Sequence, residues 1–414
     1  MTRNGYGWID AFKLIAAILV IALHTGPLYS IDPYADFVLT SIVARLAVPF
    51  FFIASGFFLF GKLTGERKAD LASLRRFTRR IGMLYGAGIV LYLPFDFYGG
   101  NDAGPFRIAA LAEDVVFNGT FYHLWYLPAL ILGTWIVYGL RAALSSRAAL
   151  AAAAVLYVMA LIGDSYYGLA KQSAALTAVY DGLFAIFDYT RNGIGFAPLY
   201  IALGAWAARQ PLLQLPRRHL KYAATFAVSM ALLLAEGIAL HEAGWPRHDS
   251  MYVALVPAVY CLFRLLQGAG GKERPIWRSL STWIYMLHPL AIVIVRGIAK
   301  WTGSTAIFVE NRLVHFLAVV LATFLISALS MLMMRNMRIR KKQAPSRHRA
   351  WAEIDLDRLA HNVRQLRSIV PIGTALMAVV NLLFWGPIPV AALWLASRIG
   401  GDGVLIFAAI VAAF

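Results

Sequence analysis

Long apolar stretches separated by short polar segments occupy most of the chain up to residue 335. Ten of them approach the ~20 residues that an α-helix needs to cross the hydrocarbon core of a bilayer. They lie at residues 8–29, 37–60, 80–98, 122–141, 148–164, 192–209, 219–240, 250–267, 279–299 and 314–335. The pattern therefore predicts an all-α integral membrane protein, with a bundle of about ten transmembrane helices in residues 1–336.

The composition agrees with a chain embedded in a membrane. Of its 414 residues, 60% are hydrophobic and 14% are charged, whereas about a quarter of the residues of an average soluble domain are charged. Cys261 is the single cysteine, which excludes a disulfide framework and a thiolate metal cluster, and no metal is expected. The first apolar stretch is too long for a signal-peptide core and contains Asp10, Lys13 and His24, so we expect a retained first helix.

The net charge of +17 indicates topology rather than binding to nucleic acid, because the basic residues lie between apolar stretches without interleaved aromatic residues. With a cytoplasmic N-terminus, the inner segments hold 24 Lys and Arg residues and the outer segments hold 7. The positive-inside rule therefore favours this orientation. The even number of spans places the end of the bundle on the cytoplasmic side as well.

The character of the chain changes after the last predicted span. Residues 337–348 are basic and form a predicted cytoplasmic linker that stops the tenth helix or binds anionic headgroups. Residues 349–369 are polar with a helical pattern, and the chain becomes apolar again from Leu382, so that the tail at 381–414 is apolar with glycine and proline breaks. This last segment allows one or two further membrane segments.

Ionisable side chains inside membrane spans are costly, so each is a candidate functional group. Lys13 precedes His24 by eleven residues, which is about three helical turns or ~16 Å on nearly the same face. His24 and His123 lie near the outer ends of antiparallel helices, where the two imidazoles can meet. A neutral imidazole can take a proton from a hydroxyl group, and the cation below it can hold the phosphates of an acyl thioester. The alternative is that each histidine only bonds a backbone carbonyl.

Several motifs match those of a known family in order along the chain. The pieces are Lys13 and His24, Arg45 followed by VPFFFIASGF at 48–57, RRFTRR at 75–80, HLWYL at 123–127, RNG at 191–193, and STWIY at 281–285 before His288 and Pro289. With these pieces the sequence resembles the acyltransferase-3 membrane family over about 330 residues. The family commonly has arginine at the position of Lys13, and lysine keeps the charge but loses bidentate phosphate binding.

The resemblance implies roles for particular residues. It implies that His24 is the catalytic base, with Lys13 and Arg45 as charge partners and His123 in the catalytic group. The substrate-binding residues that it implies are Trp125, Arg191, Asn192, Ser55 and His288.

A second resemblance concerns the tail and parts of the membrane region. NGTFYHLWYLPAL at 118–130, IGDS at 162–165 and TRNG at 190–193 are similar to the membrane half of the vancomycin-resistance serine/alanine racemases. AWAEIDLDRLAHNV at 350–363 and LMAVV at 376–380 are similar to the start of alanine-racemase domains. The lysine that would bind pyridoxal phosphate is replaced by Asn381, and no lysine follows Lys342. We therefore expect a truncated racemase stub at 349–380 that binds no pyridoxal phosphate.

These observations favour a multi-pass O-acyltransferase of a bacterial inner membrane. It would transfer an acyl group from a cytoplasmic thioester, with acyl-CoA as the expected co-substrate, to a hydroxyl acceptor in the cell envelope. Its expected partners are the lipid bilayer, the donor and the acceptor, and not nucleic acid. The alternative is a serine-supply or anchoring domain of a serine/alanine racemase, because a buried path of lysine and histidine also suits transport.

Overall fold

A computed structural model of the chain describes residues 5–98, 113–211 and 216–343. The described residues form helices joined by turns, and they contain no β-strand. The chain divides into two units, Met1–Met334 and Arg335–Phe414, and only residues 335–343 of the second unit are described. The predicted racemase stub, the apolar tail and the last part of the linker lie outside the described residues.

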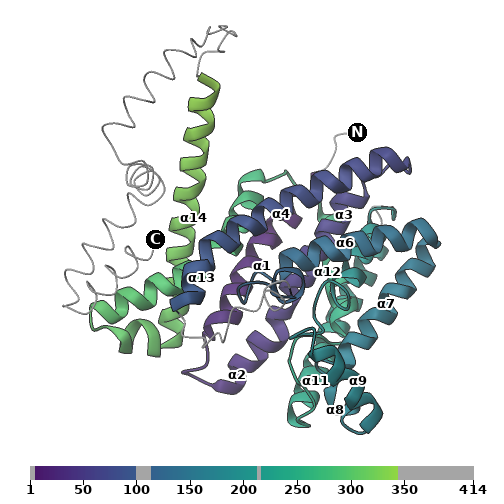
Figure 1. Cartoon of the computed structure of the whole chain (residues 1–414), viewed down its shortest axis with the longest axis horizontal. Helices are drawn as coiled ribbons and strands as arrows, with labels where there is room; N and C mark the ends of the chain where they lie inside the picture. Colours follow the sequence, from purple (N-terminus) through teal and green to yellow (C-terminus); the bar gives the residue numbers. More distant parts are fainter. Residues whose placement is uncertain (1–4, 99–112, 212–215, 344–414) are drawn as a thin grey trace, which may run out of the picture. The chain divides into compact units, whose positions relative to one another are not determined.

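The helices follow the predicted apolar stretches (Figure 1). The second stretch is not one regular helix, because a π-helical segment and a 3-10 segment join α2 to α3. In chain order, the helices of at least four residues are α1 (Gly7–Thr25), α2 (Pro33–Phe37), η1 (Val38–Ile42), η2 (Val43–Leu46), α3 (Ala47–Phe60), α4 (Arg67–Tyr98), η3 (Asp114–Asn118), α6 (Tyr126–Ala143), α7 (Ser146–Ile162), α8 (Tyr167–Ala170), α9 (Ala174–Phe184), α10 (Ala197–Ala207), α11 (Pro216–Glu242), α12 (Leu255–Ala269), α13 (Pro275–Trp301), η4 (Ala306–Glu310) and α14 (Arg312–Gln343).

Six segments of the described chain are long and apolar enough to cross a membrane. They are α1, the segment Pro33–Phe60, α6, α13, and most of α11 and α14. The chain is therefore an all-α, multi-pass membrane protein. The other four predicted spans coincide with α4, α7, α10 and α12, of which the last three have 17, 11 and 15 residues. The count of ten spans stays a prediction.

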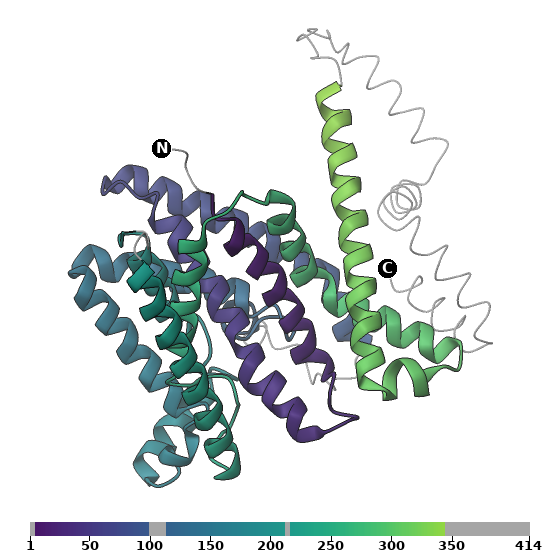
Figure 2. The same ribbon diagram turned by 180° about the vertical axis from the view of Figure 1, so that it is seen from behind.

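Helix α1 lies inside the bundle, where it packs against α3, α12 and α13 (Figures 1 and 2). Helices α3 and α10 pack so closely that their backbones touch through two glycines. A Cβ atom on Gly56 would lie 2.3 Å from the carbonyl oxygen of Ile201, and one on Gly204 would lie 2.1 Å from that of Ile53. Small residues that let helix backbones approach are typical of membrane bundles.

The predicted spans at 192–209 and 250–267 begin later than expected, because irregular backbone precedes α10 and α12. Unpaired backbone groups are costly at membrane depth, so such segments need polar partners. Asn192 Oδ1 accepts hydrogen bonds from the amides of Ile194 and Gly195, at 2.9 and 3.0 Å. The carboxylate of Glu236 accepts hydrogen bonds from the amides of Val253 and Ala254, at 2.6 and 2.8 Å.

Candidate functional site

A cavity of about 1010 Å³ runs through the bundle beside α1. This volume lies at the upper end of the range for small-molecule sites. Seven of the nine residues predicted for the site lie on its wall. These seven come from α1, η2, α3 and the loops before α6 and α10. They are Lys13, His24, Arg45, Ser55, His123, Trp125 and Arg191. Asn192 and His288 are buried and do not line it.

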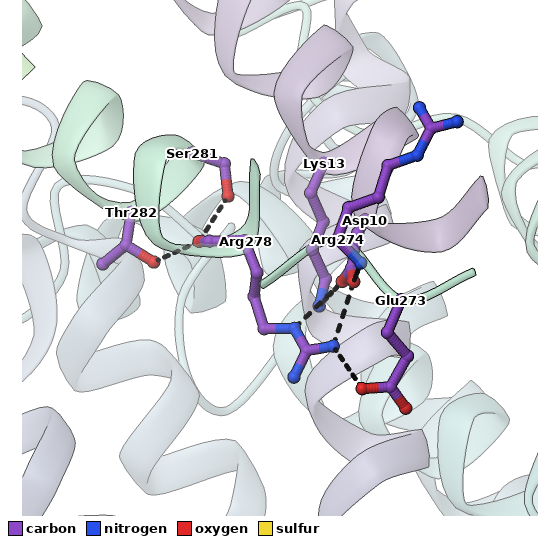
Figure 3. A network of polar contacts seen from close by, with 7 residues as sticks. All are labelled: Asp10, Lys13, Glu273, Arg274, Arg278, Ser281 and Thr282. Carbon is purple, nitrogen blue, oxygen red and sulfur yellow. Dashed lines mark hydrogen bonds and ion pairs between the residues drawn. The ribbon is translucent and has the colours of Figure 1, made fainter. Parts of the chain in front are cut away.

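One end of the cavity, which we call the lysine end, contains Lys13 and Arg278. The buried carboxylate of Asp10 accepts two hydrogen bonds from Arg278, with Nε at 3.0 Å and Nη2 at 2.9 Å (Figure 3). It also accepts the amide of Arg274, at 3.2 Å, and lies 4.0 Å from the amine of Lys13. Glu273, 3.7 Å from Arg278, is exposed. Two cations thus share one buried carboxylate, and both side chains line the cavity.

The opposite end, which we call the histidine end, contains His24 and His123. Eleven residues of α1 separate it from Lys13, about three turns or ~16 Å. The ring of His288 lies behind both, with its centroid 5.4 Å from that of His24 and 5.2 Å from that of His123. Both ring nitrogens of His123 and Nε2 of His288 are buried without a hydrogen-bond partner. The histidine end therefore holds unsatisfied polar atoms next to the cavity.

The orientation of His288 follows from the proline after it. Pro289 has no amide hydrogen, so the carbonyl of Tyr285 lacks the helical hydrogen bond that this amide would donate. His288 Nδ1 takes that place, 2.8 Å from the Tyr285 oxygen and 3.2 Å from that of Ile284. A carbonyl only accepts, so Nδ1 carries the proton and Nε2 is the acceptor.

Two arginines, Arg45 and Arg191, lie close to the histidine end, and we call them the arginine pair. Both interact electrostatically with His24 and with each other. Arg191 stacks on two rings, 5.1 Å from the centroid of Trp125 and 4.4 Å from that of Tyr189. Ion pairs within 4.0 Å among the described residues involve only Asp10 and Glu273 as acids, so neither arginine has a carboxylate partner.

The loop before α12 completes this wall with Arg247, His248, Asp249 and Ser250. Asp164 holds the loop: its buried carboxylate accepts the Ser250 amide and hydroxyl at 2.9 and 2.8 Å. It also accepts the Met251 amide at 3.0 Å. Burial and the charges of nearby arginines lower the pKa of His248 to about 4, so this histidine is neutral at pH 7.

The sequence did not predict the role of this loop. Arg247, His248 and Asp249 precede the predicted span at 250–267 and belong to no periodic apolar pattern. Asp164, which holds the loop, is 86 residues away from Ser250 in the chain. Asn192, which was predicted to bind substrate, bonds only backbone atoms of its own loop, including the carbonyl of Tyr189 at 3.0 Å. These bonds fold the loop that carries Arg191. In the described part of the chain, no group of three or more His, Cys, Asp or Glu residues is arranged to hold a metal ion.

Comparison with known proteins identifies the class. The model of the acyltransferase-3 family, described as an acyltransferase domain, matches residues 6–332, so the chain belongs to this family. The predicted family is thereby confirmed.

Curated relatives include an amino-acid racemase of Enterococcus faecalis, 36% identical over 390 residues, which are 93% of this chain and 54% of the relative. A serine/alanine racemase of Enterococcus gallinarum is 32% identical over 383 residues, 91% of this chain and 53% of the relative. The chain thus spans about half the length of the curated relatives it matches. The alignment of 390 residues is longer than the match at 6–332, so the similarity continues outside the acyltransferase domain. No solved structure matches the chain.

Proposed function

We propose that the chain is a membrane O-acyltransferase that moves an acyl group from a cytoplasmic thioester, acyl-CoA, to a hydroxyl acceptor in the cell envelope. The main support is the position of Lys13 and His24, about three turns apart on α1 and on the wall of one cavity. The cationic side chains of the lysine end, Lys13 and Arg278, suit the phosphates of the donor. The donor's thioester would then extend along α1 toward His24.

The reaction follows from the chemistry of a neutral imidazole. His24 accepts the proton of the acceptor hydroxyl as its oxygen attacks the thioester carbonyl carbon. The carbon–sulfur bond breaks, the sulfur leaves with the proton from His24, and the products are an ester and a free thiol. His288 packs on the His24 ring with an interplanar angle of 20°, and we assign it the role of positioning that ring.

We propose a cytoplasmic N-terminus in a bacterial inner membrane, because basic residues divide 24 to 7 between the two sets of connecting segments. This orientation places the lysine end on the cytoplasmic side, where acyl-CoA is found. Reporter enzymes fused at residues 70 and 345 should read cytoplasmic, and one at residue 110 should read external. A cytoplasmic signal at residue 110 would overturn the orientation.

The second candidate is a membrane domain that supplies or anchors an amino-acid racemase, which the names of the racemase relatives favour. We propose that this chain itself neither binds pyridoxal phosphate nor racemises, because Asn381 stands at the expected lysine position. Borohydride reduction of protein mixed with pyridoxal phosphate should fix no cofactor to the chain. A trapped adduct together with D-serine formation would contradict this proposal and show that the chain is a racemase.

The test of acyl transfer uses the full chain in inverted membrane vesicles supplied with radiolabelled acetyl-CoA and envelope fragments. Wild type should transfer the label, and His24→Ala should lose about 100-fold or more of the rate, as expected for a general base. His315→Ala is the matched control, because His315 does not line the cavity and its Nδ1 lies 2.8 Å from the carbonyl oxygen of Phe308. Equal transfer by wild type and His24→Ala would reject the assignment.

A further inference from the structure

The arginine pair carries charge that the protein leaves unpaired. Nε of Arg45 and Nε of Arg191 are buried without a hydrogen-bond partner. Both side chains line the cavity. Buried charges are costly unless they are paired, and stacking on Trp125 and Tyr189 offsets only part of that cost for Arg191. The pair therefore suits an acidic group of a ligand in the cavity.

A carboxylate on the same wall also lacks a partner. Asp249 Oδ1 is buried without a hydrogen bond, and Asp249 acts on Arg45 electrostatically without an ion pair within 4.0 Å. The other nearby carboxylate, Asp164, is occupied by hydrogen bonds to Ser165, Ser250 and the Met251 amide. Asp164 also interacts electrostatically with both arginines, without an ion pair within 4.0 Å. The cavity wall thus carries two arginines and one aspartate, each with a buried polar atom that has no hydrogen-bond partner.

We propose that the histidine end binds a small zwitterion, with its acidic group at Arg45 and Arg191 and its ammonium group at Asp249. A simple anion would leave Asp249 unpaired, and a simple cation would leave the arginine pair unpaired. Because both arginines act on His24, the rest of the ligand lies near that imidazole. The acceptor class that fits all three contacts is a small hydroxy amino acid, with its hydroxyl group toward His24. Only the hydroxyl assignment rests on the proposed acyl transfer.

Binding to the full chain in lipid nanodiscs, without an acyl donor, tests the site directly. Isothermal titration calorimetry would compare L-serine with 3-hydroxypropanoate, which lacks the ammonium group, and with ethanolamine, which lacks the carboxylate. L-serine should bind roughly 10-fold or more tightly than either analogue, because each lost group leaves a charged hydrogen bond unmade. Equal affinity for the three compounds, or no binding of L-serine, would overturn the proposal.

Variants separate the two halves of the site. Arg45→Gln and Arg191→Gln should lower the affinity for L-serine to that for ethanolamine, and Asp249→Asn should lower it to that for 3-hydroxypropanoate. Arg209→Gln is the control, because Arg209 bonds Ser146 outside this cavity. Arg45→Lys and Arg191→Lys keep the charge and should retain part of the affinity even where the glutamine variants fail to fold. Unchanged L-serine binding in folded glutamine variants would overturn the site.

The two proposals can fail separately. Binding of L-serine with no acyl transfer to any hydroxyl would support the zwitterion site and reject the acyltransferase reaction. Transfer of acetyl groups by a chain that does not distinguish L-serine from its analogues would reject the zwitterion site and leave the reaction intact.

Discussion

The two ends of the cavity differ in how their charges are satisfied. At the lysine end, Asp10 bonds Arg278 twice and the Arg274 amide once, and it also lies near Lys13. At the histidine end, buried polar atoms of five residues have no hydrogen-bond partner, namely those of Arg45, His123, Arg191, Asp249 and His288. Native proteins satisfy most buried polar groups, so a cluster of exceptions calls for a specific cause. The buried carboxylate of the lysine end is hydrogen-bonded within the protein, whereas the histidine end keeps buried polar atoms that no described residue satisfies.

The largest expected effect comes from removing the carboxylate that holds the loop of the histidine end. Asp164→Ala leaves the amide and the hydroxyl of Ser250 without an acceptor, and each buried polar group left unpaired costs ~1–3 kcal/mol. The Met251 amide loses its bond to Asp164 and keeps the longer one to Ser165 Oγ, at 3.3 Å. We expect a loss of about 3–6 kcal/mol in the free energy of unfolding. Hydrogen exchange at residues 248–251 should rise. Asp181→Ala, an exposed position on α9, is the control, and equal melting temperatures for the two variants would contradict this role.

A smaller loss is expected at the lysine end. Asp10→Asn removes the charge that Arg278 pairs with, but the side chain of Arg278 is 44% exposed, so solvent screens part of the effect. We expect a loss of about 1–3 kcal/mol in the free energy of unfolding. Glu273→Gln is the matched control, because its side chain is 58% exposed, and it should change stability by less than about 0.5 kcal/mol. A stronger effect of Glu273→Gln would show that the exposed pair holds this end.

The smallest effect concerns pH at the histidine end. The pKa of folded His248 is about 4, below its ordinary value of about 6.5, so the unfolded chain binds the proton more strongly between these pH values. This histidine therefore favours the folded state fully above pH ~6.5 and loses that contribution as the pH falls to about 4. Melting temperatures of wild type should drop more over this range than those of His248→Gln. Parallel curves would contradict the prediction.

The sequence predicted the parts of the fold and site that depend on local period. Apolar length located the helices, and the spacing of Lys13 and His24 on one helical face placed both on one wall. It could not predict the partner of Asp10, because Arg278 lies 268 residues away in the chain. The sequence did not predict the role of Asp164 for the same reason. Contacts between distant segments leave no periodic pattern in the sequence.

The short helices were mispredicted in a way that has a physical cause. Apolar residues before α10 and α12 extend the hydropathy signal, but their backbone is irregular and is satisfied by Asn192, Asp164 and Glu236. Such backbone is tolerated at membrane depth where it lines a cavity. The departure from the predicted spans thus coincides with the wall of the candidate site.

The central claim is that chemistry occurs at the histidine end while the lysine end binds the donor. The most direct test is steady-state kinetics of acetyl transfer by Lys13→Gln and His24→Ala at varied acetyl-CoA. Lys13→Gln should raise KM for acetyl-CoA about 10-fold or more with kcat nearly unchanged, because it removes donor binding. His24→Ala should lower kcat about 100-fold or more with KM nearly unchanged. A wild-type kcat in His24→Ala would contradict the claim.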